Sequence, residues 1–158
     1  MPIPRRDASK LLACLSVMLM AAACPRIACA TLGEPESSVQ TDAVQIQGSI
    51  KAMTDHEVYR VHEITMPSGT LLREFVSLNG TVFAVAWSGP TMPNLRQTLG
   101  QYYDKLVPLA KLNHADHNHL QILQSDIVYQ VSGHMRAFSG RAYIPGAVPA
   151  GVDLGDLH

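Results

Sequence analysis

The densest group of potential metal ligands in this sequence is a histidine-rich segment of six residues. His114, His117 and His119 lie there together with Asp116. Imidazole nitrogens suit zinc, copper and nickel. A structural zinc site, however, usually takes its ligands from two separate elements of the fold. We therefore favour a polar surface loop, keep a metal site at the three histidines as the weaker alternative, and predict no cofactor.

A second group of charged residues lies near the C-terminal end of the sequence. His134 and Arg136 alternate onto one face of an expected strand, and Arg141 follows on the same hairpin. Guanidinium groups match the geometry of carboxylate and phosphate, so the group predicts a small anion pocket. The alternative is that the two arginines pair across strands with Glu63 or Glu74.

Three further residues complete the candidate ligand site. Arg73 and Glu74 resemble an acid and base pair, although neighbours on a strand point to opposite faces. Trp87 is the only tryptophan and comes just before a proline-containing break, where it could line a groove or simply pack in the core. The predicted ligand-binding residues are Arg73, Glu74, Trp87, His134, Arg136 and Arg141.

Sequence motifs of common enzymes are missing from the chain. It contains no G-x-S-x-G, H-E-x-x-H, phosphate-binding P-loop or dinucleotide fingerprint. We therefore expect a non-catalytic accessory domain that binds a protein partner of the cell envelope or a small ligand. The alternative is a cell-envelope hydrolase that uses His134 with a nearby carboxylate such as Glu74.

The first thirty residues have the three parts of an export signal. A basic start is followed by an apolar run over 11–23, and small residues stand at Ala28 and Ala30. The run has thirteen residues, whereas a helix that crosses a bilayer needs about twenty. We therefore predict cleavage after Ala30, a periplasmic or extracellular protein, and no permanent transmembrane anchor.

The three cysteines, Cys14, Cys24 and Cys29, all lie in this leader. The mature chain would then contain no thiol and no disulfide. A small-residue stretch before Cys24 leaves open a different outcome, in which this cysteine is acylated and the protein is an envelope lipoprotein.

The charge of the remaining chain disfavours nucleic acid as a partner. Residues 31–158 carry twelve acidic and eight basic residues, a net charge of −4, whereas nucleic-acid binding needs a broad basic face. The length suits one domain. We divide the chain into a signal peptide over 1–30, a single domain over 31–147 and an extended tail over 148–158.

Periodicity predicts an α+β fold. An apolar stripe every three or four residues indicates a helix from Ser37 to Met53, and another indicates a second helix from Pro93, with Pro108 disturbing its last turn. Runs rich in β-branched residues predict five strands, over 57–66, 70–78, 81–87, 120–131 and 134–144.

The turn residues predict how these strands connect. Pro67-Ser68-Gly69 and Asn79-Gly80 favour tight turns, so the first three strands should form an antiparallel meander. Ser132-Gly133 is expected to join the last two. The continuous apolar run over 82–87 indicates a central strand covered on both faces, and both helices should pack on one face of the sheet.

Several segments together resemble the exported proteobacterial domain-of-unknown-function family 2844. The segments that carry the resemblance are 67–70, 73–76, 82–90, 93–95, 99–100 and 133–143. The resemblance covers most of the mature chain and implies an exported bacterial domain. It implies no catalytic residue or ligand.

Overall fold

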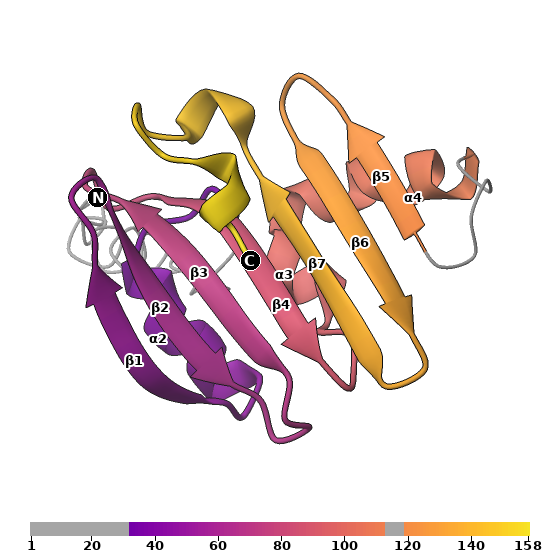
Figure 1. Cartoon of the computed structure of the whole chain (residues 1–158), viewed down its shortest axis with the longest axis horizontal. Helices are drawn as coiled ribbons and strands as arrows, with labels where there is room; N and C mark the ends of the chain where they lie inside the picture. The colour runs from indigo at the N-terminus through magenta and orange to yellow at the C-terminus, as the bar shows by residue number, and fades with distance from the viewer. Residues whose placement is uncertain (1–31, 113–118) are drawn as a thin grey trace, which may run out of the picture.

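The computed structural model describes residues 32–112 and 119–158, and a seven-stranded antiparallel sheet forms its centre (Figure 1). The strand order is β1-β2-β3-β4-β7-β6-β5. The strands are β1 (Ser49–Asp55), β2 (Tyr59–Thr65), β3 (Leu71–Ser77), β4 (Val82–Gly89), β5 (His119–Leu123), β6 (Val128–His134) and β7 (Ala137–Tyr143).

The α-helices cover one face of this sheet, and Figure 1 shows them behind the strands. They are α2 (Ser37–Gln45), α3 (Leu95–Leu99) and α4 (Tyr103–Leu112), with a 3-10 turn (Gly100–Tyr102) between the last two. The predicted α+β class, with helices packed on one face, is confirmed. In the described part of the chain, no helix has the length and apolar character needed to cross a membrane.

The predicted meander is present as β2, β3 and β4, each antiparallel to the next. Gly69 and Gly80 have positive φ angles of 86° and 81° in its two turns, a conformation that glycine adopts without steric cost. β4 is the fourth of the seven strands, and its residues 82–87 are all buried. This explains its continuous apolar run, because both faces of the strand are covered.

The first predicted helix is too long. α2 ends at Gln45, and residues 49–55 form the edge strand β1 instead. The helical conformation ends before Gln47, whose φ angle is 53°. The amide of Gly48 then donates a hydrogen bond to the carbonyl oxygen of Ala43. Ile50 and Met53 match the helical spacing of α2, but they belong to the strand β1. The pairing of β1 with β2 is irregular between these two residues.

The second predicted helix is interrupted. Gly100, with φ 48° and ψ −122°, ends α3, and α4 begins three residues later. Pro108 lies inside α4, yet the helix continues to Leu112. The disturbance expected at Pro108 thus occurs earlier, at the glycine.

The region predicted to form the last two strands forms three. The stretch 120–131 contains a turn at 124–127 that separates β5 from β6, and β6 continues through Ser132-Gly133 to His134. The turn to β7 is formed by Met135 and Arg136, and Arg136 has a φ angle of 65°. The predicted turn at Ser132-Gly133 is therefore wrong by three residues.

The C-terminal segment lies across the face of the sheet that the helices leave uncovered (Figure 1). Leu157 is completely buried there among Tyr59, Phe75, Phe83 and Ala86. The residues 148–158 that we expected to form an extended tail thus contribute a side chain to the second of two apolar clusters. The first cluster, between sheet and helices, includes Val85, Trp87 and Tyr129. We call the face under the C-terminal segment the open face.

Candidate functional site

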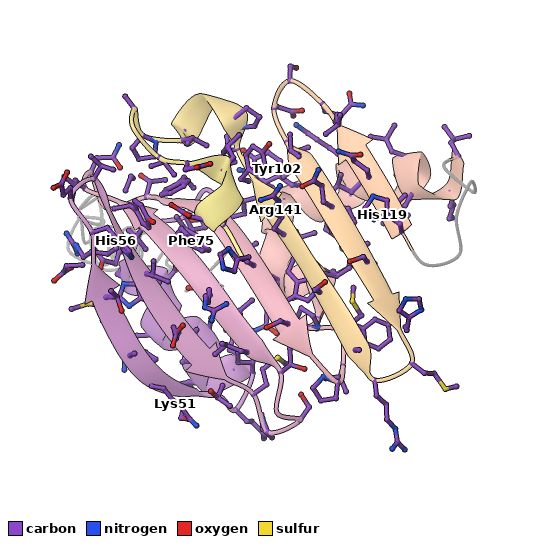
Figure 2. The ribbon with its side chains drawn as sticks, viewed as in Figure 1. Lys51, His56, Phe75, Tyr102, His119 and Arg141 are labelled. Carbon is purple, nitrogen blue, oxygen red and sulfur yellow. The ribbon has the colours of Figure 1, made fainter. Side chains whose placement is uncertain are left out.

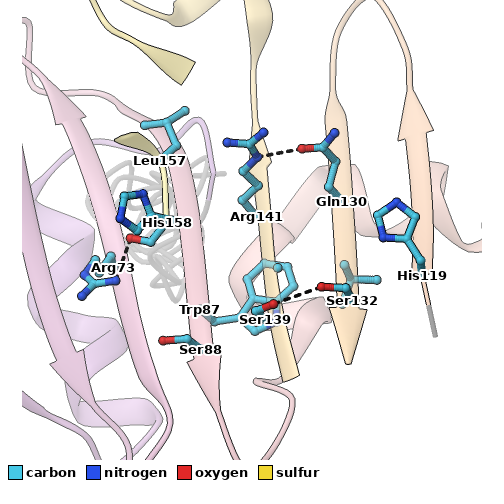
Figure 3. Close-up of a pocket in the computed structure, with 12 residues that line it drawn as sticks. Arg73, Trp87, Ser88, His119, Gln130, Ser132, Ser139, Arg141, Leu157 and His158 are labelled. Atoms are coloured by element: carbon cyan, nitrogen blue, oxygen red, sulfur yellow. Dashed lines mark hydrogen bonds between the residues drawn. The ribbon is translucent and has the colours of Figure 1, made fainter. Parts of the chain in front are cut away.

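A cavity of about 360 Å³ lies on the open face, beside the C-terminal segment (Figure 3). Its walls come from β3, β4, β5, β6, β7 and the last two residues of the chain as given, Leu157 and His158. It is the candidate functional site, and we call it the basic cavity for the side chains described next.

The register of the sheet places two rows of side chains in the basic cavity. In the first row, Arg73 of β3 is opposite Ala86 of β4, which is opposite Arg141 of β7 and then Gln130 of β6. Neighbouring strands lie about 4.8 Å apart, so the two arginines stand on either side of a single methyl group. Ala86 itself is buried in the apolar cluster that includes Leu157, and it does not line the cavity.

The second row consists of small polar residues. Ser88, Ser139 and Ser132 are successive cross-strand partners, and His119 of β5 follows them. The hydroxyls of Ser132 and Ser139 are 3.1 Å apart. Hydroxyl groups both donate and accept hydrogen bonds, so this row gives the floor of the cavity a polar surface beside the arginines.

Arg73 is held at one wall by two contacts. Its Nε donates to Glu63 Oε1 at 2.7 Å, and its Nη1 donates to the carbonyl oxygen of His158 at 2.6 Å. Glu63 is its direct cross-strand partner. The guanidinium is thereby fixed in place, and its Nη2 makes no hydrogen bond to the described residues.

Arg141 is held at the opposite wall in the same way. Its Nε donates to Gln130 Oε1 at 2.7 Å, and its Nη1 donates to the carbonyl oxygen of Leu154. Neither partner is charged, so the positive charge of Arg141 is not neutralised by a carboxylate. Here too Nη2 has no hydrogen-bond partner within the described residues.

Two imidazoles also line the cavity. His119 projects from the open face, as Arg141 does (Figure 2), and both line the cavity with His158. Among the described residues that line it, none is acidic. A site with two arginines, two histidines and hydroxyl groups in its walls is suited to an anion.

Trp87 lies under the floor of this cavity. It is 3% exposed, and its ring belongs to the cluster beneath the helices, 6.0 Å from the ring of Tyr129. Its cross-strand partner Gly140 has no side chain, so Trp87 also borders the cavity. Its role is therefore packing rather than stacking on a ligand.

Glu74 does not reach the basic cavity. It lies on the helix-covered face, 1% exposed, and its Oε2 is buried without a hydrogen-bond partner in the described structure. Burial, and secondarily the charge of Asp42 on α2, raises the pKa of Glu74 to about 8. The carboxyl is thus neutral at neutral pH and pairs with neither predicted arginine.

A polar cluster next to Glu74 was not anticipated from the sequence. Glu36, at the start of α2, accepts hydrogen bonds from Arg60 at 2.6 Å and from His62 at 2.9 Å, both on β2. His62 is the cross-strand partner of Glu74. These contacts attach the start of α2 to the sheet, so the cluster has a structural role.

His134 and Arg136 lie away from the cavity, at the tip of the β6–β7 hairpin. His134 is the last residue of β6, Arg136 is in the turn, and both are exposed. The predicted face shared by His134 and Arg136 does not exist, because Arg136 lies in the turn. His134 and Glu74 are on opposite faces of the sheet, so the pair that a hydrolase would need is not assembled.

The predicted metal ligands are only partly described. His114 and His117 lie outside the described residues, and His119 faces the basic cavity. Within residues 32–112 and 119–158, no group of three potential ligands is close enough to hold a metal ion.

Of the six predicted ligand residues, the structure therefore brings Arg73, Trp87 and Arg141 to one cavity. The sequence analysis missed the serine row and Gln130, whose alternation with apolar neighbours is a signal of an exposed strand face. It also missed His158, for which no local pattern exists.

Comparison with protein families agrees with the resemblance noted in the sequence. The family model described as "Protein of unknown function (DUF2844)" matches residues 28–157. The chain belongs to this family. The DUF2844 match includes every strand of the sheet and every wall of the basic cavity except His158. We found no match among curated proteins or among solved structures.

Proposed function

We propose that this DUF2844 protein is an exported, non-catalytic accessory domain that binds a small anion, a carboxylate or a phosphate, in its basic cavity. The observation that carries the proposal is the pair Arg73 and Arg141, which flank Ala86 on one face of the sheet. Each guanidinium is oriented by two hydrogen bonds, and its Nη2 has no hydrogen-bond partner among the described residues.

The size of the cavity supports a small ligand. A volume of about 360 Å³ is at the lower end of ligand pockets, which measure roughly 300 to 1,000 Å³. Leu157 provides an apolar border, while the serine row provides hydroxyl groups. A compact carboxylate or phosphate with a short apolar part fits this combination.

Export of the protein is the other half of the proposal and rests on the leader. The basic start, the apolar run over 11–23 and Ala28 with Ala30 are typical of a cleaved signal. The mass of the protein isolated from the producing bacterium tests it. An N-terminus at Thr31 supports the proposal, whereas a lipid-modified Cys24 supports the lipoprotein alternative.

Isothermal titration calorimetry tests anion binding directly. Inorganic phosphate and succinate are the probes, with ethanolamine as a cationic control. The Arg141→Gln variant should bind about tenfold more weakly or worse, because charge-assisted hydrogen bonds contribute about 1.5 to 3 kcal/mol each. Arg136→Gln is the matched control, since it removes the same charge at the hairpin tip.

Two results would contradict the proposal. One is the absence of heat with either anion up to millimolar concentration. The other is an equal loss of affinity in the Arg141→Gln and Arg136→Gln variants, which would show that only the net charge of the protein matters.

A further inference from the structure

A second cavity, separate from the basic cavity, lies on the opposite side of the sheet. It has a volume of about 330 Å³ and is lined by residues of α3, α4, β5 and β6. Its walls are mainly aliphatic, and they include Leu95, Leu99, Leu120 and Ile122. We call it the helix cavity.

One stripe of α4 forms the long wall of the helix cavity. Tyr103, Leu106, Val107, Ala110 and Lys111 line it, and their spacing places them on a single face of the helix. From Tyr103 to Lys111 this face extends about 12 Å at 1.5 Å per residue. The cavity is therefore elongated, with one end at a tyrosine and the other at a lysine.

The inner end of the helix cavity carries a phenol without a partner. Tyr129 is 5% exposed, lines the cavity, and makes no hydrogen bond with its hydroxyl in the described part of the chain. Burial, and secondarily Tyr103, raises the pKa of Tyr129 to about 12. Tyr129 thus stays protonated at neutral pH, and its hydroxyl can donate a hydrogen bond to a ligand in the cavity.

The outer end is cationic. Lys111 is exposed in the last turn of α4, and it has no ion pair within the described residues. It is the only charged residue described in the walls of the cavity. An anionic head group at this end would be favoured by charge and would remain partly in water, which avoids the cost of burying it.

From these three zones we propose that the helix cavity binds a medium-chain aliphatic carboxylic acid with an oxygen atom at its far end. The carboxylate lies beside Lys111, the chain lies along Leu106, Val107 and Ala110, and the distal oxygen accepts a hydrogen bond from Tyr129. This site is independent of the anion site on the other face.

Binding is measured with decanoate and 10-hydroxydecanoate as probes. The only tryptophan, Trp87, reports on the site because its ring is 6.0 Å from that of Tyr129. We expect 10-hydroxydecanoate to bind roughly fivefold more tightly than decanoate, the effect of one net hydrogen bond. Calorimetry gives the stoichiometry, which should be one per chain.

Three variants separate the parts of the proposal. Tyr129→Phe should bind both acids equally, because the donor is lost while the ring remains. Lys111→Gln should weaken both acids, and decan-1-ol should be insensitive to this change. Ala110→Leu should abolish binding by filling the cavity, while phosphate or succinate binding at the basic cavity stays as in the unmodified protein.

The proposal is overturned if neither acid binds at millimolar concentration, or if Ala110→Leu, folded by circular dichroism, binds as well as the unmodified protein. The assignment of the inner end is overturned if the unmodified protein binds the two acids with equal affinity and Tyr129→Phe does not change these affinities.

Discussion

The indole ring of Trp87 lies directly against Gly140, its cross-strand partner on β7. A Cβ atom at residue 140 would stand 2.4 Å from Cζ2 of Trp87 and 2.9 Å from the backbone oxygen of Gln130. The ring therefore fills the place of a side chain on the helix-covered face. The same glycine lets the buried ring support the floor of the basic cavity.

Gly140→Ala should therefore destabilise the protein by overpacking. The new methyl group meets a rigid ring and backbone, so we expect a loss of about 1 to 3 kcal/mol in the free energy of unfolding. Urea denaturation followed by Trp87 fluorescence measures it. Gly146→Ala is the control, because nothing lies within 4 Å of its added methyl group. Equal stability of the two variants would show that the Trp87 ring can move aside.

Leu157 should anchor the C-terminal segment to the open face. It is fully buried among aromatic and small residues of β2, β3 and β4, and replacing a buried leucine by alanine costs about 2 to 5 kcal/mol. Leu157→Ala should therefore lower the urea midpoint strongly. Leu154→Ala, at a position 39% exposed in the same segment, should change it little. A small effect of Leu157→Ala would mean that the segment detaches at low cost.

Glu74 should make stability fall as the pH rises. Its pKa is about 8 in the folded protein and about 4.3 when unfolded, so only the unfolded chain ionises between these values. The stabilisation is complete below about pH 4.3 and is lost progressively up to about pH 8, by at most ~1.4 kcal/mol per pH unit. Above pH 8 this contribution no longer changes.

The Glu74→Gln variant should flatten that dependence, because the amide cannot ionise. Urea denaturation from pH 5 to 9 compares it with the unmodified protein, and the variant should be the more stable at pH 8. Glu63→Gln, which changes a half-exposed carboxylate on the other face, should keep the slope. Parallel curves for Glu74→Gln and the unmodified protein would refute the assignment of a neutral Glu74.

Glu63 should oppose anion binding in the basic cavity. Its carboxylate bonds to Arg73 at 2.7 Å and partly neutralises that guanidinium. Removing it in Glu63→Gln should increase the affinity for phosphate or succinate by roughly fivefold, given about 1 kcal/mol for a half-exposed pair. Glu57→Gln, at an exposed position, controls for net charge. Unchanged affinity in Glu63→Gln would place the anion away from Arg73.

Local patterns predicted the elements whose conformation depends on neighbouring residues. Asn79-Gly80 and the segment ending in Gly69 form turns with positive φ at glycine, so the meander of β2, β3 and β4 follows from the sequence. The apolar run over 82–87 likewise indicated a central strand. β1 was missed because Ile50 and Met53 extend the helical spacing of α2, and Gly48 was the only signal of a break.

The basic cavity could be predicted only in its chemistry. Arg141 suggested an anion site, but the turn at Met135-Arg136 placed its expected partners His134 and Arg136 elsewhere. A shift of three residues in that turn cannot be detected from periodicity, because an alternating strand lies on each side of the turn in either position. Residues in a turn, such as Arg136, nevertheless do not lie on either face of the sheet.

The sequence by itself determined the absence of cysteine after residue 30, the α+β class and the central β4, because each depends on composition or on contacts between near neighbours. Only the tertiary structure decided that β7 lies between β4 and β6. That insertion places Arg141 beside Ala86 and opposite Arg73, 68 residues earlier. Hydrogen bonding between strands distant in sequence selects such neighbours, and no local pattern records the choice.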